Sequence, residues 1–249
     1  MKILAIGNSF SQDATALLNG MAAHRALETK VVNLFIGGCS LYTHWKNMIS
    51  GAPDYAYELN GRYSGRQVSI REALREENWD VVTMQQASHD SGLPGTYFPH
   101  IAELSGYIRQ YAPGAEQRIH QTWAYEMDSD HEAFALYGRS QTVMYGALKA
   151  AYASASETLG LKLIPCGDVI QALRKLPIFD YANGGQSLCR DGFHLHLVYG
   201  RYAAAATWYA SVLKEDILLN DYRPPEADAA AIPLLEQIRR TVADICSQS

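Results

Sequence analysis

Near its start the sequence has Ile3-Leu4-Ala5-Ile6-Gly7-Asn8-Ser9-Phe10, a short apolar run that stops abruptly at small and polar residues. A continuous apolar run is typical of a strand whose two faces are both covered by helices. A helical pattern follows over residues 13–27, with Asp13 as its expected N-cap. The stretch therefore predicts a buried strand that leads into a helix and leaves Ser9 in the connection between them.

The same order of strand and helix recurs along the chain. Further β-branched apolar runs lie at residues 30–36, 80–84, 118–123 and 162–165. Helical patterns cover residues 41–49, 69–77, 98–111, 131–159, 169–176, 197–213 and 225–246. Such alternation implies parallel strands joined by right-handed crossovers, with helices on both faces of the sheet. We therefore predict an α/β fold, a doubly wound three-layer α/β/α sandwich, whose strand order the pattern leaves open.

Residues 53–69 interrupt this alternation. Apolar and polar side chains alternate there around Asn60-Gly61, a strong short-range signal for a β-hairpin. We predict a small hairpin inserted beside the main sheet, with a structured loop near the rim of the site as the alternative.

No linker rich in proline, glycine or serine divides the sequence, so residues 1–249 are expected to form a single domain.

Composition excludes several classes of partner. With 48% hydrophobic and 19% charged residues, the chain is typical of a globular protein. The net charge of -5, without clustered lysine and arginine, argues against nucleic acid. No apolar run approaches the roughly 20 residues that cross a bilayer. The partner expected is therefore a small molecule, with neither nucleic acid nor membrane, and the sequence leaves the oligomeric state open.

The start of the chain and its cysteines indicate the compartment. If Met1 is the native start, the first residues are too few for the apolar region of a signal peptide, which predicts a cytoplasmic location. The cysteines form no C-x-x-C pair, so they predict neither a zinc site nor a disulfide framework; they are Cys39, Cys166, Cys189 and Cys246.

Polar residues follow the predicted strands, where ligands bind in sheets of this kind. Gly7-Asn8-Ser9 follows the first strand, Gly37-Gly38 the second, Gln85-Gln86-Ala87-Ser88-His89 the third, and Asp191-Gly192-Phe193-His194 precedes a late helix. A serine is a poor nucleophile unless a histidine takes its proton and a carboxylate orients that histidine. Ser9, His194 and Asp191 supply these three groups. Backbone N–H groups of Ser9 and Gly38, with a side-chain donor after the third strand, are candidates to stabilise an oxyanion.

These motifs resemble those of the SGNH (GDSL-like) hydrolase superfamily. Gly7-Asn8-Ser9-Phe10 is similar to its G-[DN]-S-[LF] block, Gly38 lies where its oxyanion glycine follows strand two, and Asp191-Gly192-Phe193-His194 matches its D-x-x-H block. The resemblance implies a flavodoxin-like sheet of five parallel strands in the order 2-1-3-4-5. It also implies an esterase, acylhydrolase or carbohydrate O-deacetylase that needs no metal or organic cofactor.

One block departs from the pattern of the superfamily. The family has G-x-N-[DN] after strand three, where the asparagine donates to the oxyanion, whereas this chain has Gln86-Ala87-Ser88-His89. Ser88 is in register with that asparagine, and the side-chain amides of Gln85 and Gln86 are alternative donors. The third oxyanion donor therefore stays open, with Gln86 and Ser88 favoured. The departure indicates an uncharacterised subgroup of the superfamily.

Other polar residues near these motifs have simpler interpretations. In the simpler interpretation, Ser9 caps a helix and has no catalytic role. His196 is either a rival general base or a cap for the helix that follows. His194 and His196 lack a third ligand with clear spacing, and Asp130 is expected to cap the helix over residues 131–159, so we predict no metal site.

Three residues are candidate substrate contacts: Asn8, Trp123 and Glu126. Trp123 could stack on a sugar or acyl chain and Glu126 could bind a hydroxyl, with core packing as the alternative for Trp123. The leading hypothesis is a serine esterase that cleaves a small ester through an acyl-enzyme, with an O-acetylated saccharide as the preferred substrate. The alternative is a catalytically weakened carbohydrate-binding protein with the same fold.

Overall fold

A computed structural model describes residues 1–247 of the chain. Within these residues the sheet has the strand order β4-β3-β2-β1-β5-β6-β7. The strands are β1 (Lys2–Gly7), β2 (Lys30–Phe35), β3 (Tyr55–Leu59), β4 (Arg62–Val68), β5 (Val81–Met84), β6 (Glu116–His120) and β7 (Lys162–Ile164). β1 pairs in parallel with β2 and β5, and β6 pairs in parallel with β5 and β7. The predicted doubly wound fold is confirmed, with the parallel strands in the order 2-1-3-4-5.

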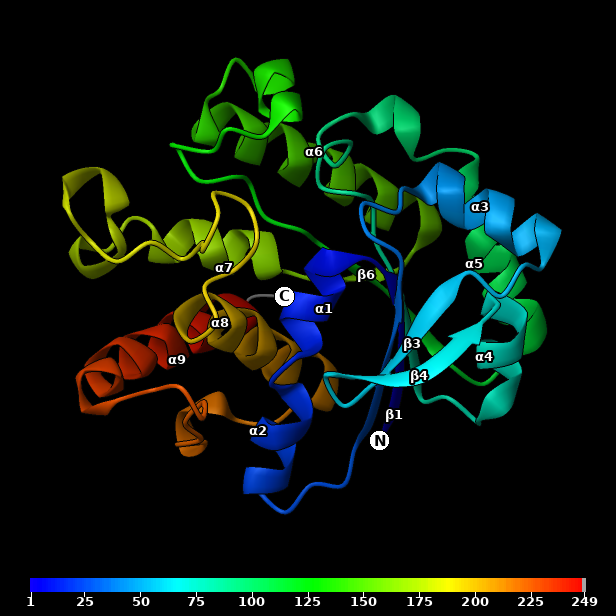
Figure 1. Cartoon of the computed structure of the whole chain (residues 1–249), viewed down its shortest axis with the longest axis horizontal. Helices are drawn as coiled ribbons and strands as arrows, with labels where there is room; N and C mark the ends of the chain where they lie inside the picture. The colour runs from blue at the N-terminus through cyan, green and yellow to red at the C-terminus, as the bar shows by residue number, and fades with distance from the viewer. Residues whose placement is uncertain (248–249) are drawn as a thin grey trace.

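Helices cover both faces of this sheet (Figure 1). They are α1 (Ser9–Thr15), α2 (Leu18–His24), α3 (Leu41–Ser50), α4 (Ile70–Glu76), α5 (His100–Tyr111), α6 (Gln141–Leu159), α7 (Cys166–Leu173), α8 (Tyr199–Trp208) and α9 (Ile232–Cys246). α3, α4 and α5 contact one another on one face of the sheet. On the other face, α1, α2, α7 and α9 each contact α8. Among residues 1–247, no helix is both long enough and apolar enough to cross a bilayer.

The predicted hairpin forms, and it extends the main sheet. β3 and β4 pair in antiparallel fashion across Asn60-Gly61, and β3 also pairs antiparallel with β2. The hairpin therefore lies in the sheet itself and covers the edge that β2 would otherwise expose.

The first helix begins at Ser9, so the prediction of Asp13 as its N-cap was wrong. Asn8 is the N-cap, because its Oδ1 accepts a hydrogen bond from the Phe10 N–H at 2.9 Å and its own N–H donates to Ser11 Oγ at 3.0 Å. These bonds satisfy donors of the first turn that have no partner within the helix. Asp13 consequently lies inside α1, where its side chain is fully buried.

The helix predicted over residues 131–159 is divided in two. A 3-10 helix covers Glu132–Tyr137, and α6 begins only at Gln141. Between them, Gly138 and Arg139 both have positive φ angles, and Ser140 caps α6 by accepting from the Val143 N–H. Asp130 is therefore not the cap of the long helix.

Candidate active site

Ser9 stands at the carboxyl end of β1, as the first residue of α1. The Asn8 side chain before it is buried and donates from Nδ2 to the carbonyl oxygen of Cys39 at 3.0 Å. This bond ties the loop after β2, which carries Gly38, to the turn that presents Ser9. The local sequence thus places the serine and the predicted oxyanion glycine on adjacent loops.

His194 and Asp191 complete a catalytic arrangement with Ser9. His194 Nε2 lies 2.9 Å from Ser9 Oγ, and His194 Nδ1 lies 2.7 Å from Asp191 Oδ2. Since a carboxylate only accepts, Nδ1 carries the proton and Nε2 is left as the acceptor for the Ser9 hydroxyl. The three side chains therefore have the geometry of a nucleophile, a general base and an orienting carboxylate.

The Asp191 carboxylate is stabilised in its charged form. Burial acts to raise its pKa, but hydrogen bonds from the His194 side chain and from the N–H groups of His194 and Phe193 outweigh burial and lower the pKa. Asp191 Oδ1 accepts from these two N–H groups at 2.7 and 3.2 Å. Asp191 is therefore ionised at neutral pH, as an orienting group for an imidazole must be.

The turn between Asp191 and His194 depends on a glycine. Gly192 has φ +84°, and a Cβ at this position would lie 2.8 Å from Ser129 Cα. A side chain is disfavoured there both by the left-handed backbone and by the neighbouring loop. The Gly192 carbonyl also accepts from the Glu126 N–H at 2.7 Å, which holds the turn against the loop after β6.

Two of the predicted oxyanion donors are backbone N–H groups, those of Ser9 and Gly38. The Ser9 N–H belongs to the first turn of α1, where N–H groups lack partners within the helix. Gly38 is exposed, has φ +63° and has open space where a Cβ would lie. These features are compatible with the roles predicted for Ser9 and Gly38 as oxyanion donors.

The side chains after β5 have distinct environments. Gln86 is fully engaged: its Oε1 accepts from the N–H groups of Leu41 and Ala87, and its Nε2 donates to the carbonyl and hydroxyl oxygens of Thr96. This engagement argues against Gln86 as an oxyanion donor. Ser88 Oγ lies 3.0 Å from the hydroxyl of Tyr125, and a hydroxyl can accept from one group while donating to another.

The three predicted substrate contacts are all buried, with exposed fractions of 1% for Asn8, 0% for Trp123 and 2% for Glu126. Asn8 caps α1, as described above. Trp123 stacks on Phe10 with ring centroids 4.3 Å apart and donates from Nε1 to the carbonyl of Phe193. Asn8 and Trp123 therefore support the site from beneath. Trp123 is packed in the core, as the alternative interpretation of the sequence expected.

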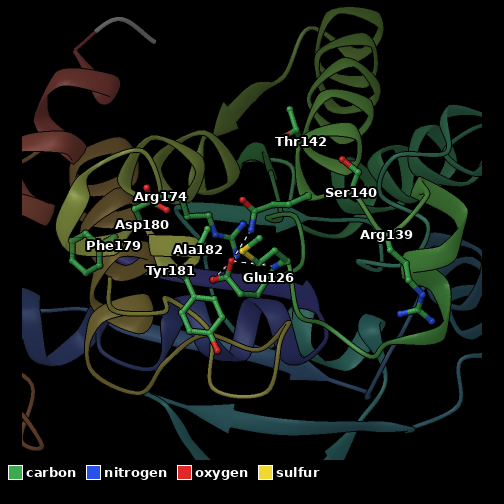
Figure 2. A pocket seen from close by; sticks show the side chains of 11 residues that line it. Glu126, Arg139, Ser140, Thr142, Arg174, Phe179, Asp180, Tyr181 and Ala182 are labelled. Carbon is green, nitrogen blue, oxygen red and sulfur yellow. Dashed lines mark hydrogen bonds and ion pairs between the residues drawn. The ribbon is translucent and has the colours of Figure 1, made fainter. Parts of the chain in front are cut away.

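Glu126 is paired with an arginine rather than free to meet a ligand. Its Oε2 lies 3.4 Å from Arg174 Nη2 and accepts from the Ser187 hydroxyl at 3.1 Å, and its Oε1 accepts from Gln141 Nε2 at 2.7 Å. This ion pair lies in the wall of a cavity of about 360 Å³, where Figure 2 shows the two side chains pointing toward each other. Substrate binding by Glu126 stays a prediction that these contacts do not favour.

His196 takes the capping position that was the alternative to its role as a base. Its Nδ1 accepts from the N–H groups of Val198 and Tyr199, just before and at the start of α8. Within residues 1–247, no group of three or more histidine, cysteine, aspartate or glutamate side chains is arranged to hold a metal ion.

Two buried residues that the sequence alone did not reveal, Gln85 and Asp13, support the site. Gln85 Nε2 donates to Asn8 Oδ1 at 2.7 Å, and Gln85 Oε1 lies 2.6 Å from His120 Nδ1. Asp13 accepts from Arg190, Arg201 and the Leu195 N–H. For Asp13, the available signal was its position four residues after Ser9; Gln85 was predicted only as an alternative donor to the oxyanion.

Comparison with known proteins identifies relatives of this chain. The sequence profile of DUF4886, described as a domain of unknown function, matches residues 2–242. The crystal structure of a DUF4886 family protein from Bacteroides uniformis is 35% identical and has a TM-score of 0.90, over 98% of this chain and 93% of that one. No curated protein matches the sequence.

More distant structures have the same fold. A candidate SGNH hydrolase from Slackia heliotrinireducens is 25% identical with a TM-score of 0.57, over 83% of this chain and 96% of that one. An acetyl xylan esterase, AlAXEase, has a TM-score of 0.59 at 13% identity, over 85% of this chain and all (100%) of that one. The predicted resemblance to the SGNH hydrolases, in a subgroup of unknown function, is confirmed.

Proposed function

Because this chain belongs to the DUF4886 family and brings Ser9, His194 and Asp191 within hydrogen-bonding distance, we propose that it is a serine esterase that cleaves a small ester through an acyl-enzyme. The observation that carries this proposal is the 2.9 Å separation of Ser9 Oγ from His194 Nε2. The hydrolase folds of the structural neighbours support it.

The proposed reaction has two acyl-transfer steps. Ser9 Oγ attacks the ester carbonyl as its proton passes to His194 Nε2, and Asp191 stabilises the imidazolium. His194 then gives this proton to the departing alcohol oxygen, so that the acyl group remains on Ser9. A water molecule next loses a proton to His194 and attacks the acyl carbonyl, and the proton returns to Ser9 Oγ as the acid leaves.

We assign the third oxyanion donor to Ser88, because the side-chain amide of Gln86 is already engaged and that of Gln85 is buried against Asn8. Ser88→Ala is expected to lower kcat by about 100-fold, in the range found when one oxyanion donor is removed. The measurement is steady-state turnover of an activated acetate ester. Ser91→Ala is the matched control. It removes a hydroxyl that donates to the Ser88 carbonyl in the same turn, but it keeps the Ser88 hydroxyl. Equal kcat in wild type and Ser88→Ala would show that the donor lies elsewhere.

The preferred substrate class is an O-acetylated saccharide. The side chains of His194 and Asp191 are 21% and 43% exposed, so the reacting groups are accessible to a bulky alcohol portion. A long acyl chain needs a buried apolar channel to gain affinity, whereas an acetyl group does not. The acetyl xylan esterase, which shares the fold of this chain, supports this choice of substrate class. The cytoplasmic location stays a prediction.

A fluorophosphonate probe tests the proposal directly. An activated serine attacks phosphorus and is labelled covalently, whereas a serine that only caps a helix is not activated. We expect labelling of the folded wild-type protein on the peptide that contains Ser9, detected by mass spectrometry, and none after denaturation. Absence of labelling, together with binding of acetylated saccharides without turnover, would instead support the weakened carbohydrate-binding protein.

A further inference from the structure

Asp13 is a buried carboxylate that the proposed reaction does not use. It lies on α1 one helical turn beyond Ser9, so the two residues lie on the same side of that helix. Its side chain is fully buried, with an exposed fraction of 0%. A carboxylate in such a position is costly unless charged or N–H partners surround it. The identity of those partners indicates what Asp13 does.

The partners of Asp13 come from both ends of the segment that carries His194. Arg190 Nη1 donates to Asp13 Oδ1 and Oδ2 at 3.1 and 2.9 Å, and the Leu195 N–H donates to Asp13 Oδ2 at 2.8 Å. Arg190 directly precedes Asp191, and Leu195 directly follows His194. A single carboxylate on the helix of the nucleophile therefore binds both ends of the catalytic loop, which we define as residues 190–195.

Further hydrogen bonds join the two ends of the catalytic loop and hold the Asp13 carboxylate in place. The Arg190 N–H donates to the His194 carbonyl at 2.9 Å, and Arg190 Nη1 also donates to the Leu195 carbonyl. Arg201 on α8 donates from Nε to Asp13 Oδ1 at 2.8 Å. The carboxylate thus has donors on both oxygens, and the catalytic loop is anchored to α1 and indirectly to α8.

We propose that Asp13 is a positioning residue, which sets the distance between His194 and Ser9 by docking the catalytic loop on α1. This inference rests on the proposed serine esterase, since it assigns Asp13 a role in that reaction. Asp13 does not touch the hydroxyl or the imidazole. It acts through Arg190 and Leu195, so its loss changes how often the imidazole is in place rather than the chemistry of the imidazole.

Asp13→Asn is the principal test. The amide keeps the size of the carboxylate but turns an NH₂ group toward donors and removes the negative charge between two guanidinium groups. We expect kcat for an activated acetate ester to fall about 100-fold, the effect of displacing reacting groups by roughly 1 Å, with KM unchanged. Amide hydrogen exchange in the catalytic loop should become faster, whereas exchange in β1 should not.

Two further variants separate positioning from general stability. Glu76→Gln is the matched control, because Glu76 lies on α4 and accepts from Lys30, Arg66 and Tyr57 away from the catalytic loop. It should lower the melting temperature without changing kcat. Arg190→Gln removes only one partner of Asp13 and should give an intermediate loss of kcat, even if Asp13→Asn fails to fold.

The outcomes distinguish this inference from the proposed function. If the wild-type protein neither turns over esters nor reacts with the fluorophosphonate, the esterase proposal fails by itself. Positioning by Asp13 is overturned if Asp13→Asn, or Arg190→Gln where the former does not fold, leaves both kcat and exchange in the catalytic loop at wild-type values. It is equally overturned if KM rises while kcat stays constant, since that pattern belongs to a residue that binds substrate.

Discussion

Replacing Ser9 with alanine is expected to reduce kcat for an activated acetate ester by a factor on the order of 10⁵ to 10⁶, the effect of removing the nucleophile from a serine triad. Without Oγ, no acyl-enzyme forms, and His194 can only assist the attack of water. The side chain of Ser9 makes a hydrogen bond to His194, while Asn8 caps α1. The free energy of unfolding should therefore change by less than about 1 kcal/mol.

The control for this variant is Ser154→Ala, which removes an exposed serine hydroxyl from the middle of α6. Turnover by Ser154→Ala should equal that of the wild type, and thermal unfolding of all three proteins should be similar. If Ser9→Ala retained more than about one hundredth of wild-type turnover, another nucleophile would have to be responsible.

The residues of the triad could be predicted because each lies in a short, recognisable segment of sequence. A serine in the turn that follows a strand, and an aspartate and a histidine three positions apart, are visible without tertiary information. The structure adds only that these segments meet, as parallel sheets require of groups near their carboxyl edge. The strand order followed from the resemblance alone, because the alternation of strands and helices is compatible with several orders.

The supporting residues could not be predicted because their partners are distant in the sequence. Asp13 and Arg190 are 177 positions apart, so Asp13 resembled an ordinary helix cap until the fold placed Arg190 beside it. Glu126 resembled a residue of the cleft because it follows a strand, but Arg174, the C-cap of α7, and Gln141, the first residue of α6, enclose it. Gln86 also resembled a residue of the cleft, but its side-chain amide donates to Thr96. Polar residues after strands are therefore divided between catalysis and support by contacts that only the fold determines.

Stability is expected to fall steeply when the pH is lowered from 6 to 5, because two histidines are buried in their neutral form. His44 and His120 both have exposed fractions of 0%, and burial lowers the pKa of each to about 3. His44 Nδ1 lies 2.8 Å from the Tyr55 hydroxyl, and His120 Nδ1 lies 2.6 Å from Gln85 Oε1. Neither contact offers a negative charge that would favour the protonated ring.

Whether stability rises or falls with pH depends on how many protons the folded and unfolded states bind. In the unfolded chain a histidine has a pKa near 6.5, so between about pH 3 and 6.5 the unfolded state binds up to two more protons than the folded state. Lower pH therefore favours unfolding, and the stability present above pH 6.5 is lost progressively below it. The limiting slope for two groups is about 2.7 kcal/mol per pH unit. This is a large fraction of the 5–15 kcal/mol that typically stabilises a domain.

Denaturant unfolding at pH 7, 6 and 5 measures this slope, and a single substitution assigns it. His44→Gln should lower the slope by about 1.4 kcal/mol per pH unit, because glutamine does not titrate, whereas His120 keeps its own contribution. Tyr55→Phe is the control, since it deletes the hydroxyl beside His44 but keeps the imidazole buried, and its pH dependence should match that of the wild type. If His44→Gln left the slope unchanged, His44 would have to be protonated in the folded protein, and a negative charge or water would have to reach a ring that the fold encloses.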